Sequence, residues 1–299
     1  MLIIQWNAKS LVAHGSEFKK YVSDLLIKPD IICFQETWLK EHNRFHMPGY
    51  TLIRRDRARS KGGGCGIMVK FGVPFTETED ITELECILIK VHGSRGRVTI
   101  INFYNPCQPL MHKSLQEVFR RCEGVVLVCG DFNSHNILWG SKDTDRNGGI
   151  IEDLIDEFDM VILNDGQGTC INPSTGKMSP LDLTLISSIE AARCDWEVHD
   201  DNLGSDHFPV ITNLQCERGS VDSLGPASWN FSKANWGQFS DRCVREVKEE
   251  IGVHNIDSIN RKFVQIMNNI ACETIPTSIP SVGRKFKVPW WNEDCKLPI

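Results

Sequence analysis

Short apolar runs rich in β-branched residues recur along the first two thirds of the chain. Each run is bounded by glycine, proline or polar residues, which is the pattern of β-strands. The predicted strands are Leu2–Trp6, Ile31–Phe34, Tyr50–Ile53, Gly66–Phe71, Cys86–Val91, Val98–Tyr104, Val125–Cys129, Met160–Leu163, Leu181–Ile186 and Phe208–Leu214. Strands therefore dominate this part of the chain.

Three segments between these runs space their apolar residues for one buried stripe, which predicts amphipathic helices. The stripes are Phe18, Val22, Leu25 and Leu26; Leu115, Val118 and Phe119; and Ile150, Ile151, Leu154, Ile155 and Phe158. Interspersed helices among many strands predict an α/β fold with two face-to-face sheets and helices outside them.

The pattern changes after Cys216. Residues 217–228 read ERGSVDSLGPAS, a composition typical of a linker. Two helical stripes follow, and then a Pro-rich, aromatic tail; the stripes are Trp236, Phe239, Cys243, Val247 and Ile251, and Ile259, Phe263, Ile266 and Ile270. We therefore expect one domain over 1–216 and a C-terminal helical appendage over 217–299 that docks on the domain or on a partner.

Composition limits the function classes. The 299 residues are 41% hydrophobic, which is enough for one large core, and the net charge of −6 argues against coating nucleic acid through bulk charge. An enzyme with an acidic metal site remains compatible with that charge. The twelve cysteines form no C-x₂₋₄-C pair, no signal peptide precedes the first strand, and no apolar run has the length of a membrane span. These features predict an intracellular protein with free thiols.

Side chains suited to catalysis stand at the ends of six predicted strands. They are Asn7, Glu36, Tyr104, Asp131 with Asn133, Asp182, and Asp206 with His207. Singly, Gly-Asp-Phe-Asn at 130–133 and Asp206-His207 are also typical of ordinary turns. Together, six such strand ends favour a catalytic edge, because loops at strand ends are where a scaffold presents reactive groups.

This set of residues suits phosphodiester hydrolysis. Glu36 and neighbouring carboxylates supply oxygen ligands for a hard cation. Asp131, oriented by Asn7 and Asn133, can act as the base that activates water. His207, held by Asp182, can stabilise the charge that develops on the phosphate oxygens.

At these residues the sequence resembles the endonuclease/exonuclease/phosphatase superfamily, which implies a four-layered α/β sandwich. The resemblance is narrower to the endonuclease domain of non-LTR, jockey-type retrotransposon polyproteins. It rests on Gln-Trp-Asn at 5–7, Phe-Gln-Glu-Thr-Trp-Leu at 34–39, Asn-Ser-His-Asn-Ile-Leu-Trp-Gly at 133–140 and Pro-Trp-Trp-Asn at 289–292.

The resemblance implies a nickase for double-stranded DNA. It would use Mg²⁺, with Mn²⁺ as an alternative, and would expose a 3′-hydroxyl for target-primed reverse transcription. The parent polyprotein would also be an RNA-directed DNA polymerase, whose reverse transcriptase domain is absent from this chain. Such an enzyme acts in the nucleus. No membrane contact is expected.

Carried over residue by residue, the resemblance makes Glu36 the metal ligand and Asp206 a supporting or alternative metal ligand. Asp131 would be the base, Asn7 and Asn133 would hold it and the phosphate, Tyr104 would contact the phosphate, and Asp182 would pair with His207. Thr169 and Ser179 would be hydroxyls near the phosphate. One departure is Lys9, which stands where apurinic endonucleases carry an acid, so a repair role is disfavoured.

Two further features of the sequence each allow two interpretations. The basic stretch that contains Arg54, Arg55, Arg57, Arg59 and Lys61 before Gly62 either contacts the DNA backbone or forms a solvated hairpin loop. Trp139 is either a core residue or a base-stacking platform, and a core position is favoured.

Two alternative functions also stay open. The first is another phosphoesterase of the same fold, which acts on small molecules or lipids. The second is an inactive remnant that only binds nucleic acid.

Overall fold

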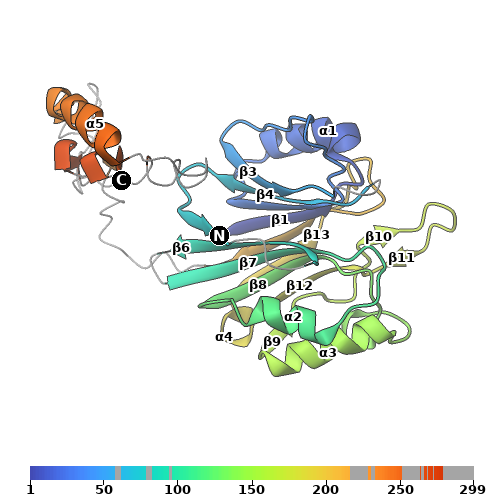
Figure 1. Cartoon of the computed structure of the whole chain (residues 1–299). Coiled ribbons are helices and arrows are strands. Elements are labelled where there is room, and N and C mark those ends of the chain that lie inside the picture. Colours follow the sequence, from blue (N-terminus) through green and yellow to red (C-terminus); the bar gives the residue numbers. More distant parts are fainter. Residues whose placement is uncertain are drawn as a thin grey trace, which may run out of the picture. The chain divides into compact units, whose positions relative to one another are not determined.

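Two six-stranded sheets face each other in the computed structural model (Figure 1). The structure describes residues 1–57, 62–78, 83–93, 96–215, 228–229, 233–250 and 263–278, without 264, 265, 268 and 272. The chain divides into two compact units, Met1–Cys216 and Glu217–Ile299. The two sheets belong to the first unit.

The first sheet has the strand order β13-β14-β1-β2-β4-β3. The bounds are β1 Leu2–Asn7, β2 Ile31–Gln35, β3 Tyr50–Arg55, β4 Cys65–Lys70, β13 Cys194–Val198 and β14 Val210–Leu214. Strands β1 and β2 run parallel, and the other neighbours are antiparallel. The parallel pair therefore ends at one edge of the sheet.

The second sheet has the order β5-β6-β7-β8-β12-β9. The bounds are β5 Phe75–Glu77, β6 Glu85–Gly93, β7 Gly96–Tyr104, β8 Val125–Asp131, β9 Met160–Ile162 and β12 Asp182–Ser187. Strands β7 and β8 form its parallel pair. A separate two-stranded hairpin joins β10 (Cys170–Ile171) to β11 (Met178–Ser179).

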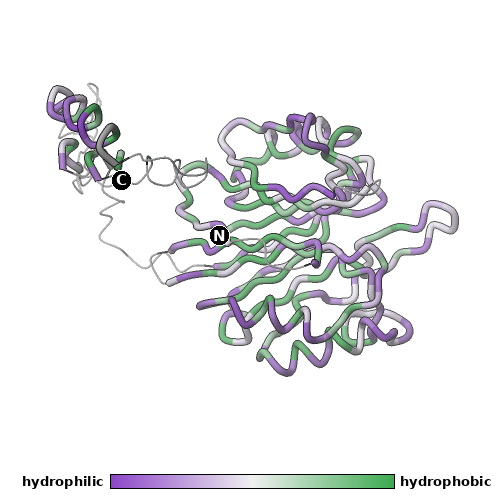
Figure 2. The backbone as a smooth tube through the Cα atoms, viewed as in Figure 1, coloured by the Kyte–Doolittle hydropathy of each residue, from purple (hydrophilic) through white to green (hydrophobic). Residues whose placement is uncertain are grey.

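The layers follow from the two-residue period of the strands. In β2, the side chains of Ile31 and Cys33 enter the core between the sheets, whereas Ile32 and Phe34 enter the core under a helix. A strand buried on both faces has no polar alternation. Figure 2 shows this as mostly hydrophobic strands, beside helices in which hydrophobic and hydrophilic positions alternate.

Helices cover the outer faces of both sheets (Figure 1). On the first sheet lies α1 (Leu11–Asp24), whose Phe18 stacks on Trp6 at 5.0 Å between ring centroids. On the second lie α2 (His112–Phe119) and α3 (Arg146–Glu157). The sandwich of two sheets between helical layers that the strand pattern predicted is confirmed. Among the described residues, no helix combines the length and apolarity needed to cross a bilayer.

Several short elements were absent from the predicted set. They are β5, β10, β11, β13, the four-residue helix α4 (Ser188–Ala191) and the 3₁₀ turn Ile137–Trp139. Strand β13 reads CDWEV and lies at a sheet edge, where its apolar residues alternate with the exposed Asp195 and Glu197. The prediction followed continuous apolar runs and therefore missed this alternating, half-buried strand. Trp139 is fully buried, as favoured from the sequence.

In the second unit, α5 spans Trp236–Glu250, and β15 (Ser228–Trp229) pairs with β16 (Thr277–Ser278). Arg242 in α5 donates to Glu246 one turn later at 2.7 Å. The predicted linker 217–228 lies outside the described residues except for Ser228. Ile259 and the tail 279–299, with Pro-Trp-Trp-Asn, also lie outside them. The assignment of this unit as a connector to a polymerase stays a prediction.

Candidate active site

Strand register brings the predicted catalytic residues to one edge of the two sheets. In the first sheet, Asn7 is paired with Gln35, the residue before Glu36. In the second sheet, Asp131 is paired with Tyr104 on one side and with Asp182 on the other. Local pairing alone thus assembles two half-sites, one for each sheet.

A hydrogen bond between the sheets joins the two halves. The Asn7 side-chain nitrogen donates to Asp131 Oδ2 at 2.8 Å and also approaches Glu36 Oε1 at 3.3 Å. Asn7 therefore bridges a carboxylate of each sheet.

Asp131 is held by three donors. Besides Asn7, the side chain of Asn133 donates to Oδ2 at 2.9 Å, and the backbone N–H of Asn133 donates to Oδ1 at 3.0 Å. The preceding Gly130 has φ +148°, and a Cβ atom there would lie 1.8 Å from the carbonyl oxygen of Phe103. The Gly-Asp-Phe-Asn sequence is thus required by close strand approach as well as by chemistry.

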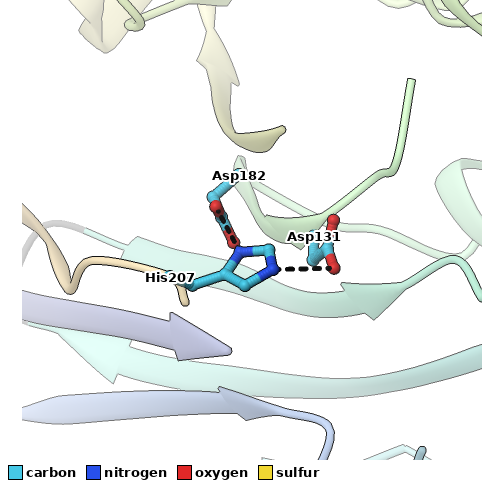
Figure 3. A group of neighbouring side chains, drawn as sticks. All are labelled: Asp131, Asp182 and His207. Carbon is cyan, nitrogen blue, oxygen red and sulfur yellow. Dashed lines mark hydrogen bonds and ion pairs between the residues drawn. The ribbon is translucent and has the colours of Figure 1, made fainter. Parts of the chain in front are cut away.

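His207 lies between two carboxylates (Figure 3). Its Nδ1 is 2.8 Å from Asp182 Oδ2, and its Nε2 is 4.0 Å from Asp131 Oδ2. All three side chains are buried. The predicted Asp182–His207 pair therefore forms, and it directs the second ring nitrogen toward Asp131.

Burial and neighbouring charge set the protonation of this group. Burial raises the pKa of Asp131 to about 7, against the lowering effect of His207. Burial alone would lower the pKa of His207, but Asp182 raises it well above the usual value. The site thus combines a carboxylate that can accept a proton near neutral pH with a cationic imidazole.

Glu36 follows β2 directly and borders a cavity of about 500 Å³. Its Oε2 accepts a hydrogen bond from the indole nitrogen of Trp38 at 2.9 Å, and its Oε1 accepts the one from Asn7. Tyr104 borders the same cavity; burial raises the pKa of its hydroxyl, and Glu36 adds to this effect. A carboxylate oxygen that accepts one hydrogen bond keeps a second lone pair, so Glu36 can still bind a cation.

Asp206 forms an ion pair with Lys9. This hydrogen bond raises the pKa of Lys9, which keeps the ammonium charged. The other oxygen of Asp206, Oδ1, is buried and has no hydrogen-bond partner among the residues that the structure describes. Asp206 was predicted as a metal ligand, and in the structure it shares its carboxylate with an amine.

Candidate cation ligands therefore occur in two places. Asp131, Asp182 and His207 offer ligand atoms within 4.8 Å of one another. A cation there would displace the existing hydrogen bonds of these three residues. Glu36, with open lone pairs at the cavity, fits a hard divalent cation without such a loss.

Backbone strain is concentrated in the loops around this edge. Positive φ values occur at Lys9 (42°), Glu36 (48°), Trp38 (51°) and Asn133 (44°). Such conformations are costly for residues other than glycine and persist where surrounding contacts enforce them, often at functional sites. Their position here agrees with an active site at these strand ends.

Of the two hydroxyls predicted near the phosphate, one binds Asp182 and the other borders a separate cavity. Thr169 is fully buried, and its hydroxyl donates to Asp182 Oδ2 at 2.6 Å. It is thus placed to support Asp182, whereas the sequence predicted a phosphate contact. Ser179 borders a separate cavity of about 430 Å³ that also includes His135 and Lys177.

The two predicted DNA-contacting arginines bind the protein itself. Arg54 donates to the carbonyl of Asn43 at 2.8 Å, and Arg55 donates to that of Leu84 at 2.6 Å. Their guanidinium groups therefore stabilise neighbouring loops, and their predicted contact with DNA stays a prediction. Arg57 pairs with Glu85, whereas Arg59 and Lys61 lie outside the described residues.

Two residues of the site were missed from the sequence. Ser205 donates to the Asn7 carbonyl at 2.8 Å and accepts from the His207 N–H at 3.2 Å, so it fixes the loop to β1. Trp38 binds Glu36. The available signal was their proximity in sequence to Asp206-His207 and to Glu36, but adjacency does not reveal where a side chain points.

Comparison with known proteins shows which proteins this chain is similar to. Residues 98–211 match a family model described as endonuclease-reverse transcriptase. The RNA-directed DNA polymerase from mobile element jockey of Drosophila melanogaster is 24% identical over 215 residues, which are 70% of this chain and 23% of that protein. The chain thus spans about a quarter of the length of this relative.

Solved structures share the fold. The endonuclease domain of TRAS1, a telomere-specific non-LTR retrotransposon, gives a TM-score of 0.61 at 20% identity, over 71% of this chain and 97% of that one. The AP endonuclease LMAP from Leishmania major gives 0.59 at 15% identity, over 71% and 86%. The Xenopus laevis APE2 catalytic domain gives 0.57 at 19% identity, over 72% and 91%. The family match, the curated relative and the shared fold confirm the predicted resemblance to the endonuclease domains of non-LTR retrotransposons in the endonuclease/exonuclease/phosphatase superfamily.

Proposed function

We propose that this chain is a divalent-metal-dependent DNA endonuclease that nicks target DNA and leaves a 3′-hydroxyl for reverse transcription. The observation that carries the proposal is the buried Asp131 carboxylate, fixed by Asn7 and Asn133 beside the Asp182–His207 pair. The retrotransposon relatives support DNA as the substrate and a reverse transcriptase as the partner domain. Nicking of chromosomal DNA would take place in the nucleus.

The residues divide the reaction among them. Asp131 takes the proton of the attacking water, because its raised pKa matches base catalysis near neutral pH. His207, kept cationic by Asp182, stabilises the charge that grows on the non-bridging phosphate oxygens. Asn7 keeps Asp131 aligned with Glu36 across the sheets.

Glu36 would hold the divalent cation, Mg²⁺ or Mn²⁺. When bound, the cation would polarise the phosphoryl group and stabilise the leaving oxygen. Asp206 is a weaker candidate ligand because Lys9 already neutralises its carboxylate. Tyr104, on the cavity with Glu36, is placed to donate its hydroxyl to a phosphate there.

A plasmid assay tests this proposal. Supercoiled DNA should become open circular with Mg²⁺ and stay closed with EDTA. Asp131→Asn and His207→Ala should lose nicking, whereas Asp195→Asn, on the edge strand β13, should retain it. A protein that leaves DNA closed but releases phosphate from small phosphoesters would be a phosphatase of this fold. DNA binding without any hydrolysis would indicate an inactive remnant.

A further inference from the structure

The indole of Trp38 contacts the carboxylate that the proposed function assigns to the cation. Its Nε1 donates to Glu36 Oε2 at 2.9 Å. Asn7 donates to the opposite oxygen at 3.3 Å, and the Tyr104 hydroxyl also forms a hydrogen bond with Glu36. Trp38 and Asn7 thus hold the two oxygens of the carboxylate from opposite sides, which fixes its rotation.

The backbone holds Trp38 in a conformation that a tryptophan rarely adopts. Its φ is 51°, and Glu36 two residues earlier has φ 48°. The Trp38 N–H donates to the Gly63 carbonyl at 3.0 Å, and the Thr37 N–H donates to the Gly64 carbonyl at 3.1 Å. Because neighbouring contacts enforce this strain, the direction of the indole toward Glu36 is a built feature of the loop.

A glycine makes room for the indole. A Cβ atom at Gly62 would lie 3.1 Å from Trp38 Nε1, and Gly62 has φ +75°. A larger residue there would crowd the nitrogen that binds Glu36 and would be strained as well. Gly62 leaves room for the indole, and the carbonyls of Gly63 and Gly64 hold the backbone of this loop.

Trp38 is also open to the cavity. Its side chain is 39% exposed, although it is a large apolar group. It borders the cavity together with Glu36, Lys40, Arg57, Tyr104 and Pro106. A cation at Glu36 would therefore lie close to the indole.

We propose that Trp38 is a positioning residue for Glu36, and that its indole N–H sets the carboxylate in the orientation that binds the divalent cation. This inference rests on the proposed function only in taking Glu36 as the cation ligand. It does not depend on the cleavage of DNA. Trp38 itself touches neither the cation nor the reacting atoms in this proposal.

Direct measurement of Mn²⁺ binding by calorimetry tests the proposal. Trp38→Phe keeps the ring and removes the donor, and it should weaken Mn²⁺ binding by about 10- to 100-fold, as is typical when a partner of a metal ligand is removed. The matched control is Trp196→Phe, which removes an indole hydrogen bond of 3.1 Å to Thr184. This control should bind Mn²⁺ like the wild type. Unchanged affinity in Trp38→Phe would overturn the proposal.

A spectroscopic readout tests whether the cation binds beside Trp38. Tb³⁺ bound at Glu36 should emit when tryptophan is excited, because the indole of Trp38 is adjacent. The emission should disappear in Trp38→Phe and in Glu36→Gln, and it should persist in Trp196→Phe. Emission that persists in Glu36→Gln would contradict the assignment of the cation to Glu36, on which the role of Trp38 depends. Denaturant unfolding of Trp38→Phe should match that of the wild type.

Rescue gives a third test. Excess Mg²⁺ should restore nicking in Trp38→Phe, because the ligand is present but misoriented, and should not restore it in Glu36→Gln. If the wild type cuts no DNA but Trp38→Phe still weakens cation binding, the role of Trp38 is supported and the proposed function is wrong. If the wild type nicks DNA but Trp38→Phe leaves the Mn²⁺ affinity unchanged, the proposed function is supported and the role of Trp38 is wrong.

Discussion

His207 Nδ1 lies 2.8 Å from Asp182 Oδ2, so the imidazole is bound to a carboxylate that stands 25 residues earlier in the chain. Replacement by Asn keeps the shape of Asp182 but removes the charge that holds the imidazole cationic. We expect Asp182→Asn to lower the single-turnover nicking rate by about 100- to 10,000-fold, the range seen when the partner of an essential His is lost.

The control for this change is Asp165→Asn. Asp165 is exposed and accepts a hydrogen bond from the backbone of Gln167. Its variant should nick DNA at the wild-type rate. Equal rates for wild type and Asp182→Asn would show that His207 works without its carboxylate.

The raised pKa of Asp131 predicts a pH dependence of nicking. The groups that face Asp131 and set its charge environment are Asp182, His207, Tyr104 and Cys107. Because the base must be deprotonated and its pKa is about 7, the rate should rise with pH and level off above that value. Below it, each pH unit should change the rate about tenfold. Initial nicking rates, measured at saturating Mg²⁺ at pH values below and above 7, would check this pH dependence.

Asn7→Ala should shift the pH profile of nicking to higher pH. The Asn7 hydrogen bond lowers the pKa of Asp131, so its removal should shift the midpoint to higher pH. Asn213→Ala, at an exposed position of β14, should leave the midpoint unchanged. A midpoint that moves to lower pH in Asn7→Ala would contradict the assignment of Asp131 as the titrating base.

Lys9→Met should strengthen cation binding. The Lys9 ammonium neutralises Asp206 and also feels the charge of Glu36, so it competes with a cation for the same carboxylates. The pair is partly exposed, and we expect a gain of about 3- to 10-fold in Mn²⁺ affinity. Lys90→Met, which breaks a similar ion pair with Glu123, should leave Mn²⁺ affinity unchanged. Weaker binding in Lys9→Met would show that the amine supports the site.

Thr169→Val should destabilise the fold as well as the site. The hydroxyl donates to Asp182 and accepts from the backbone N–H groups of Leu181 and Asp182. Valine leaves these buried groups without a partner, which should lower the free energy of unfolding by about 2 kcal/mol. Urea titration would measure it, with the exposed Thr51→Val as a control and Thr169→Ser as the rescue. Unchanged stability in Thr169→Val would mean that water replaces the hydroxyl.

The sequence by itself determined the sandwich and placed most residues of the candidate site at strand ends. Strand runs show a two-residue period locally, and a polar residue at the exit of a buried strand lies at a sheet edge whatever its neighbours are. Asn7, Tyr104 and Asp131 were therefore placed correctly at strand ends before their partners were known. The short edge strand β13 was missed because its apolar and polar residues alternate, whereas the prediction relied on continuous apolar runs.

Only the tertiary structure decided which hydrogen-bond partner each side chain has. Asn7 reaches Asp131 across 124 residues, and Lys9 reaches Asp206 across 197. Arg54 and Arg55 donate to loop carbonyls, and Thr169 donates to Asp182 inside the core, contacts that the sequence did not indicate. Periodicity reports the face on which a residue lies, whereas hydrogen-bond partners depend on how distant loops meet, which no local pattern contains.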